Sequence, residues 1–392
     1  MVAEATITPE RRLHLQTRWM VTIAAGTLLG GLTLHQEQRR FNPVVELLAQ
    51  QKPVFGLYAP SNRGAGRGGP GGGRGAAGAG AGAGGAGAAV AGGGAAGAAA
   101  AGAVASGVTT AASPPVTPPT PKTPAELAKD AVDYKLGDYV FDGSMEGANN
   151  FDRAYGGFGD FVKGMGDAAP LQKSPTLRMT HPLFVKTPMI AVDPKVAGER
   201  IARQLNLGVS GVVFVGVESA DEVKQGLAMM RFKSKGGTRP EDVGNAPGYW
   251  GMSEKEYKNK ADVWPLNPKG ELVNFTIVES KEGLAHIREI AAVKGIGVLF
   301  PGAGTLRGVF STRDSSGRTV RDTVGWEGAI QQVLAACKEF KVACGYPAGA
   351  ADIEMRMQQG FSVFVINWGE MGFKAVDIGR KVAGRTDTPG GE

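Results

Sequence analysis

The chain has 392 residues, of which 61 are Gly, and its formal net charge at pH 7 is +6. Residues 1–75 carry nine Lys or Arg against four Asp or Glu, so the rest of the chain is almost neutral. A nearly neutral domain with no Lys/Arg run interleaved with aromatic residues excludes a basic nucleic-acid-binding globule. The two cysteines exclude a disulfide-dense scaffold and an all-Cys zinc site.

The first 41 residues have the layout of an export signal. Arg11, Arg12 and Arg18 precede an uncharged run over residues 19–34. A basic segment followed by about 16 apolar or small residues is typical of a secretory signal, and it is short for a membrane span. No small-x-small cleavage site is obvious at its end, so an uncleaved signal-anchor is the alternative, and an ordinary buried helix is a third reading. We interpret residues 1–41 as a signal peptide or signal-anchor. We therefore expect a periplasmic or otherwise exported protein, or one attached to the inner membrane.

A low-complexity tract follows. Residues 61–110 include 20 Gly and 18 Ala, and a Pro-rich segment extends to residue 121. Such side chains cannot bury enough apolar surface to offset the entropy of ordering, so we predict disorder over residues 62–122 and in the tail, residues 385–392. The segment before the tract, residues 53–60 (PVFGLYAP), is typical of a buried strand, and a strand needs a sheet. The tract is therefore expected to be a loop inserted after the first strand of a domain over residues 42–384.

Eight short apolar runs, each followed by a helical pattern, recur along this domain. They occupy residues 53–58, 138–142, 183–187, 211–217, 272–278, 297–300, 344–346 and 362–367. Continuous apolar runs fit parallel strands that are covered on both faces. Eight strand–helix units predict an α/β fold of the TIM (β/α)8 barrel type. A doubly wound open sheet is the alternative, but no G-x-G-x-x-G follows the first strand.

The two cysteines lie seven positions apart. Cys337 falls in a helical pattern and Cys344 begins an apolar run, so we expect two buried thiols that act as small apolar side chains. A single disulfide between them is the alternative, because the leader argues for an oxidising compartment.

In a TIM barrel the chemistry lies at the C-terminal ends of the strands. The polar residues expected there are Asp142, Glu146, Lys186, Glu218, Glu279, the loop 301–307, Tyr346 and residues 367–370. Carboxylates and a lysine on one face suit a hard divalent cation and an anionic, oxygen-rich ligand. No histidine stands at the C-terminal end of a predicted strand, which argues against a His general base or a zinc site.

Several of these motifs resemble the HpcH/HpaI aldolase and citrate lyase β-subunit family. The order Val185-Lys-Thr-Pro188, then Val217-Glu-Ser-Ala-Asp-Glu222, then residues 274–282 (NFTIVESKE) is similar to the family's third to fifth units. The run from Arg231 to Arg239 resembles a further family motif. Members of this family cleave or form a carbon–carbon bond in 2-keto acids. The resemblance implies that Mg²⁺ or Mn²⁺ polarises the keto oxygen and stabilises an enolate.

The resemblance also implies roles for particular residues. Glu279 and Glu218 are expected to bind the metal, although an ion pair or a loop contact is the alternative for each. Lys186 and Glu146 are expected to be catalytic. The substrate is expected to contact Lys186 together with Arg231, Gly302, Ala303 and Trp368.

Three departures from the family pattern affect the same site. The Asp-x-Glu-His motif stands here as Ser144-Met145-Glu146-Gly147, without the histidine. The motif after the sixth strand, residues 301–306, lacks the second metal carboxylate. The substrate-binding arginine is Lys186, which keeps the charge but loses the bidentate geometry.

These observations lead to an expected function and an alternative. We expect a metal-assisted carbon–carbon lyase of the aldolase type that acts on a small 2-keto or hydroxy acid, with Mg²⁺ or Mn²⁺ as its cofactor. We also expect a homo-oligomer that binds no nucleic acid. The alternative is a non-catalytic, aldolase-like protein that binds a small carboxylate or a protein partner.

Overall fold

The computed structural model describes residues 39–62, 120–147, 149 and 151–385. Most of the predicted leader, the Gly/Ala/Pro-rich tract and the tail lie outside these residues. No helix in the described part of the chain is both long enough and apolar enough to cross a membrane.

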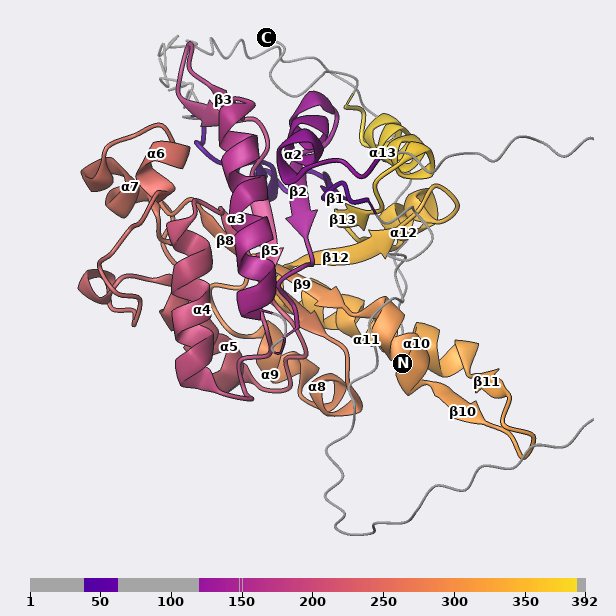
Figure 1. Cartoon of the computed structure of the whole chain (residues 1–392). Helices are drawn as coiled ribbons and strands as arrows, with labels where there is room; N and C mark the ends of the chain where they lie inside the picture. The colour runs from indigo at the N-terminus through magenta and orange to yellow at the C-terminus, as the bar shows by residue number, and fades with distance from the viewer. Residues whose placement is uncertain (1–38, 63–119, 148, 150, 386–392) are drawn as a thin grey trace, which may run out of the picture. The chain divides into compact units, whose positions relative to one another are not determined.

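Eight parallel strands close into a barrel, which confirms the predicted fold (Figure 1). In chain order they are β1 (Val54–Tyr58), β2 (Tyr139–Asp142), β5 (Leu183–Lys186), β6 (Gly211–Phe214), β8 (Leu272–Val278), β9 (Val298–Pro301), β12 (Ala343–Ala348) and β13 (Val363–Ile366). Each strand pairs with its neighbours in the chain, and the β1–β13 pairing closes the ring. The short β7 (Val263–Trp264) pairs with the start of β8.

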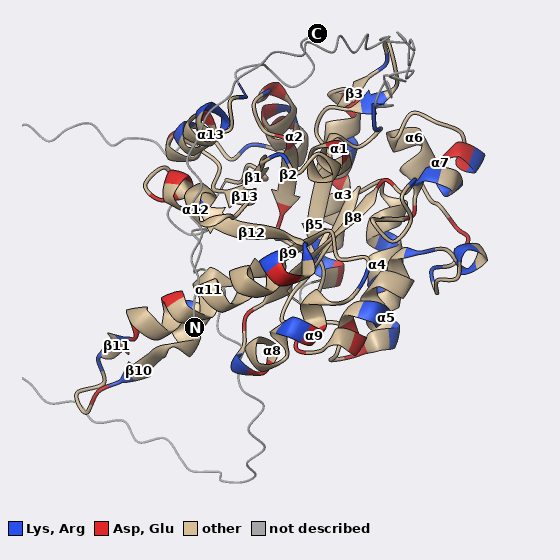
Figure 2. Cartoon of the chain, turned by 180° about the vertical axis from the view of Figure 1, so that it is seen from behind, with Lys and Arg blue, Asp and Glu red and all other residues tan. Residues whose placement is uncertain are grey.

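Helices surround the strands. They are α2 (Pro124–Asp133), α3 (Phe151–Asp167), α4 (Pro194–Asn206), α5 (Ala220–Met230), α8 (Lys281–Ala285), α9 (Ile287–Ala291), α10 (Ala303–Val309), α11 (Thr323–Phe340), α12 (Ile353–Gln359) and α13 (Glu370–Val382). His286 separates α8 from α9. Charged residues lie mostly on the helices, loops and small hairpins, whereas the eight barrel strands are almost entirely uncharged (Figure 2).

Smaller elements fill the connections. Helices α6 (Ala246–Tyr249) and α7 (Glu254–Lys260) lie in the long connection between α5 and β7. Two hairpins, β3 (Leu171–Gln172) with β4 (Arg178–Met179) and β10 (Ser311–Arg313) with β11 (Thr319–Arg321), pair only with themselves. Figure 1 shows the β10–β11 hairpin projecting away from the barrel.

Aromatic side chains fill the barrel interior. The buried cluster inside the ring includes Tyr139, Phe184, Phe275 and Phe300, with valines between them. Glycines on neighbouring strands make room for three of these rings. A Cβ atom on Gly56, Gly211 or Gly345 would lie 2.1 Å from the ring of Tyr139, Phe184 or Phe300, respectively. The barrel interior therefore reaches the close packing of a protein core by placing large aromatic rings directly against glycine backbone.

A short helix closes the N-terminal end of the barrel. Helix α1 (Pro43–Ala49) is capped by Asn42, and its residues Val44, Val45 and Leu48 belong to the same buried cluster as the barrel interior. The domain begins slightly before the predicted boundary at residue 42. Phe41 is buried against Trp250, with 4.9 Å between ring centroids.

The two ends of the tract meet beside β1. Because β1 pairs with β2 and β13 inside the ring, residues 63–119 are an insertion between β1 and α2. The side-chain amide of Asn62 donates to the carbonyl of Lys122, and the Lys122 amide donates back to Asn62 Oδ1, both at 2.7 Å. The domain thus holds the two ends of the insertion together at the C-terminal end of β1.

Cys337 and Cys344 form a disulfide, with 5.6 Å between their Cα atoms. The expectation of two free buried thiols is therefore wrong, and the alternative is the one observed. Both side chains are buried, where the bridge joins the last turn of α11 to β12.

Candidate functional site

Three inward-facing polar residues gather at the C-terminal mouth of the barrel. Tyr58, Lys186 and Glu279 each stand two positions after a residue on the interior side of a strand, at or just past the strand's end. Because strand side chains alternate between faces, all three are directed into the mouth. Charge interactions link Tyr58 with Lys186, Glu146, Glu279 and Asp142, so these groups form one cluster, which we call the mouth cluster.

Lys186 is the cation of the mouth cluster. Its side chain is only 14% exposed, and its Nζ lies 3.0 Å from Glu146 Oε2. Burial alone would lower the pKa of Lys186, but Tyr58, Glu146 and Glu279 together raise it above its ordinary value. The group is therefore an ammonium ion at neutral pH, suited to binding an anion, and it is not the free amine that a Schiff base requires.

Glu279 is the acid of the mouth cluster that lies at the end of β8. Burial raises the pKa of its carboxyl, and the Thr305 hydroxyl, the Lys186 charge and the Gly216 amide oppose that shift, whereas Glu146 adds to it. Gly302 makes this position available. A Cβ atom there would lie 2.4 Å from Glu279 Cβ and 2.7 Å from Glu279 Oε2. Gly302, predicted to bind substrate, therefore has a second role in seating the carboxyl.

Glu146 reaches the mouth cluster from the turn after β2. Asp142 is 8% exposed, and burial raises the pKa of its carboxyl, while hydrogen bonds from Ser144 oppose that shift. The Ser144 hydroxyl and amide both donate to Asp142 Oδ1, at 2.6 and 2.8 Å. Met145 is fully buried and fixes the turn to the core. Asp142 and Met145 therefore position Glu146, whose side chain remains 39% exposed.

Tyr58 is the member of the site that the sequence analysis missed. The ring of Tyr58 packs edge-on against Phe141, with 5.0 Å between centroids. Burial raises the pKa of the Tyr58 hydroxyl, and the nearby Lys186 charge opposes that shift. The period-two alternation along β1 was the available signal for Tyr58, since it leads from Val54 to this position. Thr305 belongs to the segment 301–307 that the sequence predicted at a strand end, although the structure places it in α10.

Among the described residues, Glu218 makes no hydrogen bond or ion pair with a member of the mouth cluster. Its amide donates to Glu222 Oε2 at 3.0 Å, and its carbonyl lies 3.1 Å from His286 Nδ1. Ala303 follows Gly302 and is buried, with its carbonyl accepting the indole N–H of Trp326 at 2.8 Å. The structure shows a packing role for Ala303.

Arg231 lies at the other end of the barrel from the mouth cluster, and the ring contacts of Trp368 are with residues outside that cluster. Arg231 follows α5, at the N-terminal end of the barrel, and its guanidinium makes two hydrogen bonds to Asp262, at 2.7 and 3.3 Å. A residue at that end does not reach a substrate held by Lys186. Trp368 packs edge-on against the rings of Tyr134 and Phe373, 5.9 and 5.1 Å away between centroids.

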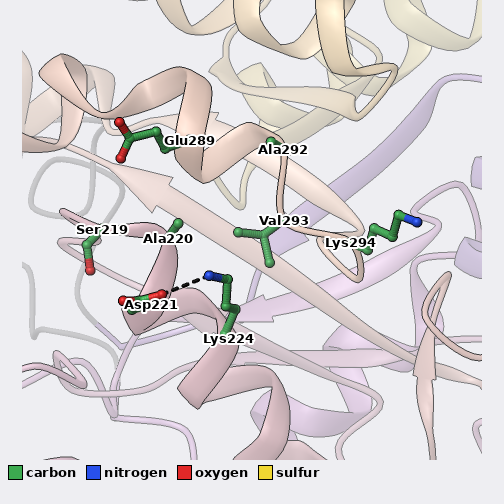
Figure 3. A pocket seen from close by; sticks show the side chains of 8 residues that line it. All are labelled: Ser219, Ala220, Asp221, Lys224, Glu289, Ala292, Val293 and Lys294. Atoms are coloured by element: carbon green, nitrogen blue, oxygen red, sulfur yellow. Dashed lines mark hydrogen bonds and ion pairs between the residues drawn. The ribbon is translucent and has the colours of Figure 1, made fainter.

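A separate cavity of about 630 Å³ lies between α5 and α9 (Figure 3). Its charged lining residues are Asp221, Lys224, Glu289 and Lys294, and Lys224 donates to Asp221 at 2.8 Å. The two signs balance, so this cavity has no net charge with which to select a ligand. It contains no member of the mouth cluster.

Metal-binding groups are sparse. Within the described part of the chain, no group of three or more His, Cys, Asp or Glu side chains is placed to hold a metal ion together. His181 precedes β5 at the opposite end of the barrel, and His286 lies between α8 and α9. Any metal at the mouth would therefore depend on one or two carboxylates.

A closed parallel barrel whose strands end in ionisable groups defines the TIM-barrel class, in which sites occupy this face. Residues 180–371 match the HpcH/HpaI aldolase/citrate lyase family. Over these residues the chain is a distant member of this family, which consists of aldolases and lyases.

Solved structures of the family are similar to this chain at low identity. An HpcH/HpaI aldolase/citrate lyase family protein from Burkholderia cenocepacia is 20% identical, covering 62% of this chain and 83% of that chain, with a TM-score of 0.48. An HpcH/HpaI aldolase from Desulfitobacterium hafniense is 16% identical over 68% and 90%, with a TM-score of 0.46. The protein CitE from Mycobacterium tuberculosis, solved with magnesium and acetate, is 14% identical over 67% and 90%, with a TM-score of 0.37. The search of curated proteins returned no match.

Proposed function

We propose that the protein forms or cleaves a carbon–carbon bond beside the keto group of a small 2-keto or hydroxy acid, through an enolate. Family membership supports the reaction class. The observation that carries the proposal is the buried ammonium of Lys186, held between Glu146 and Glu279 at the barrel mouth. A fixed positive charge in a poorly solvated site stabilises negative charge that develops on a substrate oxygen.

The roles of the chain's own groups follow from their protonation. Lys186 would bind the substrate carboxylate or the enolate oxygen as a point charge, without the fork of an arginine. Tyr58 stays protonated, because burial raises its pKa, so its hydroxyl can donate a hydrogen bond to the same oxygen. Glu146 sits on an exposed turn within hydrogen-bond distance of Lys186, so it is placed to remove or return a proton at the carbon next to the keto group.

Two carboxylates at the mouth fit the divalent metal that the family implies. Burial is the main cause of the raised pKa of Glu279, and the negative charge of Glu146 raises it further, because the two carboxylates repel each other. A dication would relieve that repulsion, and Mg²⁺ commonly takes only one or two carboxylates and completes its shell with water and substrate oxygens. Glu279 would hold the ion in place of the expected Glu218, with water and substrate oxygens as the other ligands, which leaves Glu146 available as the base. When bound, Mg²⁺ or Mn²⁺ would polarise the keto oxygen.

The ion pair between Lys186 and Glu146 also favours a second candidate function. Glu146 is bonded to the Lys186 ammonium, which is the group that a substrate carboxylate would bind. The turn that carries Glu146 also lacks the histidine of the family motif. A protein that only binds a small carboxylate, which displaces Glu146 from Lys186, would need no base.

Exchange of the pyruvate methyl protons in deuterated water tests the proposal. We expect the full-length protein with Mg²⁺ to exchange these protons, and Lys186→Met to lower the rate by about a hundredfold or more. Lys195→Met is the matched control, because Lys195 is exposed in the first turn of α4 and lies outside the mouth cluster. Pyruvate binding that depends on Lys186 without any exchange would establish the non-catalytic alternative. Equal exchange in both variants would remove Lys186 from the reaction.

A further inference from the structure

The N-terminal end of the barrel carries a basic groove with a volume of about 870 Å³. Its walls come from the end of α1, the loop after β7, the turn from α9 to β9, and the turn from α11 to β12. Four of its lining residues are lysines, namely Lys52, Lys294, Lys338 and Lys341, and none is Asp or Glu. This basic groove is therefore positively charged, unlike the balanced cavity beside α5.

The lysines of the basic groove are available to a partner. All four are exposed. The Lys338 side chain donates to the carbonyl of Gln359 at 2.8 Å, whereas the side chains of Lys52, Lys294 and Lys341 make no hydrogen bond or ion pair with any described residue. Long flexible ammonium side chains around an apolar floor can reach anions while their stems cover apolar surface.

The floor of the basic groove is apolar and partly aromatic. Trp264, Leu266 and Phe340 line it, and Leu266 is 41% exposed. Tryptophan beside basic residues is the composition that membrane–water interfaces favour. A soluble acidic peptide would explain the lysines but would leave Leu266 without a partner.

The polypeptide enters the domain at this same end. The guanidinium of Arg40 donates to the carbonyl of Pro268 at 2.7 Å and to the carbonyl of Gly270. These two carbonyls belong to the loop that also supplies Leu266 to the basic groove. The uncharged run of residues 19–34, with its flanking arginines, precedes this point of entry in the sequence.

We propose that the N-terminal end of the barrel docks on an anionic phospholipid surface, with lipid phosphates held by the lysines of the basic groove. Trp264, Leu266 and Phe340 lie at headgroup level in this arrangement. The mouth cluster is at the opposite end of the barrel and stays open to solutes. Surface lysines near anionic lipids contribute additively to binding, so three unpaired lysines provide a large share of the affinity.

Vesicle co-sedimentation of the full chain tests this proposal. Vesicles of phosphatidylcholine alone are compared with vesicles that also contain phosphatidylglycerol. The triple variant Lys52→Glu, Lys294→Glu, Lys341→Glu should lose the extra affinity for phosphatidylglycerol, by about two orders of magnitude. The matched control, Lys195→Glu, Arg313→Glu, Lys374→Glu, has the same change in charge at exposed positions outside the basic groove and should lose much less.

Each outcome decides the proposal. Loss confined to the triple variant, together with quenching of Trp264 fluorescence by brominated phosphatidylglycerol that Trp264→Phe abolishes, supports it. Equal losses in the two triple variants indicate general attraction of a basic chain and overturn it. Binding of polyglutamate but not of the vesicles also overturns it, in favour of an acidic protein partner. If charge reversal prevents folding, Lys→Gln at the same three positions provides the same comparison.

Discussion

The two ends of the barrel are built from the same eight strands and differ in how their interior positions terminate. At the N-terminal end the interior runs into Val44, Val45 and Leu48 of α1, which close the ring with apolar side chains. At the C-terminal end the interior positions of β1, β5 and β8 lead to Tyr58, Lys186 and Glu279. The N-terminal end stabilises the fold. The C-terminal end brings ionisable groups together, and these groups lose contact with water when they are buried there.

Bringing ionisable groups together in a buried site raises the pKa values of its acids. Burial raises the pKa of the Asp142 and Glu279 carboxyls, so each is harder to ionise here than in water. The apolar closure at the other end has no such cost. Changes at the N-terminal end should therefore act mainly on stability, and changes at the mouth mainly on binding and reaction.

The largest effect is expected from a charge in the apolar closure. Val45 is fully buried against the barrel interior, so Val45→Asp places an unpaired carboxylate in the core. We expect a loss of about 4 kcal/mol or more in the free energy of unfolding, measured by urea denaturation. Ala49→Asp, on the exposed side of the same helix, is the control and should cost much less. Equal losses would show that α1 does not close the barrel.

A histidine at the N-terminal end makes stability depend on pH. His181 is 4% exposed, and burial lowers its pKa to about 4 from 6.5, although a hydrogen bond to the Tyr134 carbonyl opposes the shift. The unfolded chain therefore binds this proton first as the pH falls. The neutral imidazole contributes up to about 3 kcal/mol above pH 6.5, and that contribution is lost between pH 6.5 and 4.

The measurement is the unfolding free energy as a function of pH for wild type and His181→Asn. We expect the variant to be less stable at pH 7 and to show a shallower loss on acidification. The control is His286→Gln, because the side chain of His286 is 38% exposed. Parallel pH profiles for wild type and His181→Asn would contradict the buried neutral imidazole.

At the mouth, metal binding should depend on Glu279 and not on Glu218. Saturation at about 100 times the dissociation constant would stabilise the wild type by about 2.7 kcal/mol. We expect Glu279→Gln to abolish the shift in melting temperature that Mg²⁺ or Mn²⁺ produces, with the metal-free melting temperature changed by only a few degrees. Glu218→Gln should keep the shift. The reverse pattern would restore Glu218 as the ligand and exclude the site built on Glu279.

The smallest effect is expected from removing the insertion. Because Asn62 and Lys122 already hold its ends together, replacing residues 63–119 by a short Gly/Ser linker should not disturb β1 or α2. Each halving of a loop lowers its closure entropy by only about 0.6 kcal/mol, so the domain should gain at most about 2 kcal/mol. Calorimetry should show a melting temperature changed by a few degrees. A loss of folding would mean that the tract contributes to the core.

The sequence determined the fold with good accuracy. Eight apolar runs predicted eight strands, and the predicted run 272–278 coincides with β8. Local pattern was sufficient because strands covered on both faces must be continuously apolar, and each helix between them must be amphipathic. The same pattern placed Lys186 and Glu279 at the C-terminal ends of strands, which is a property of position along the chain.

Only the tertiary structure decided which of these residues meet. Glu146 pairs with Lys186 because the turn after β2 folds over the mouth, held by Asp142 and Met145. Arg231 resembles a substrate ligand in sequence, yet it follows α5 and binds Asp262 at the other end of the barrel. Periodicity gives the face of a strand on which a side chain lies, whereas contacts between loops, the Cys337–Cys344 bridge and the closure by α1 depend on how the ring closes in three dimensions.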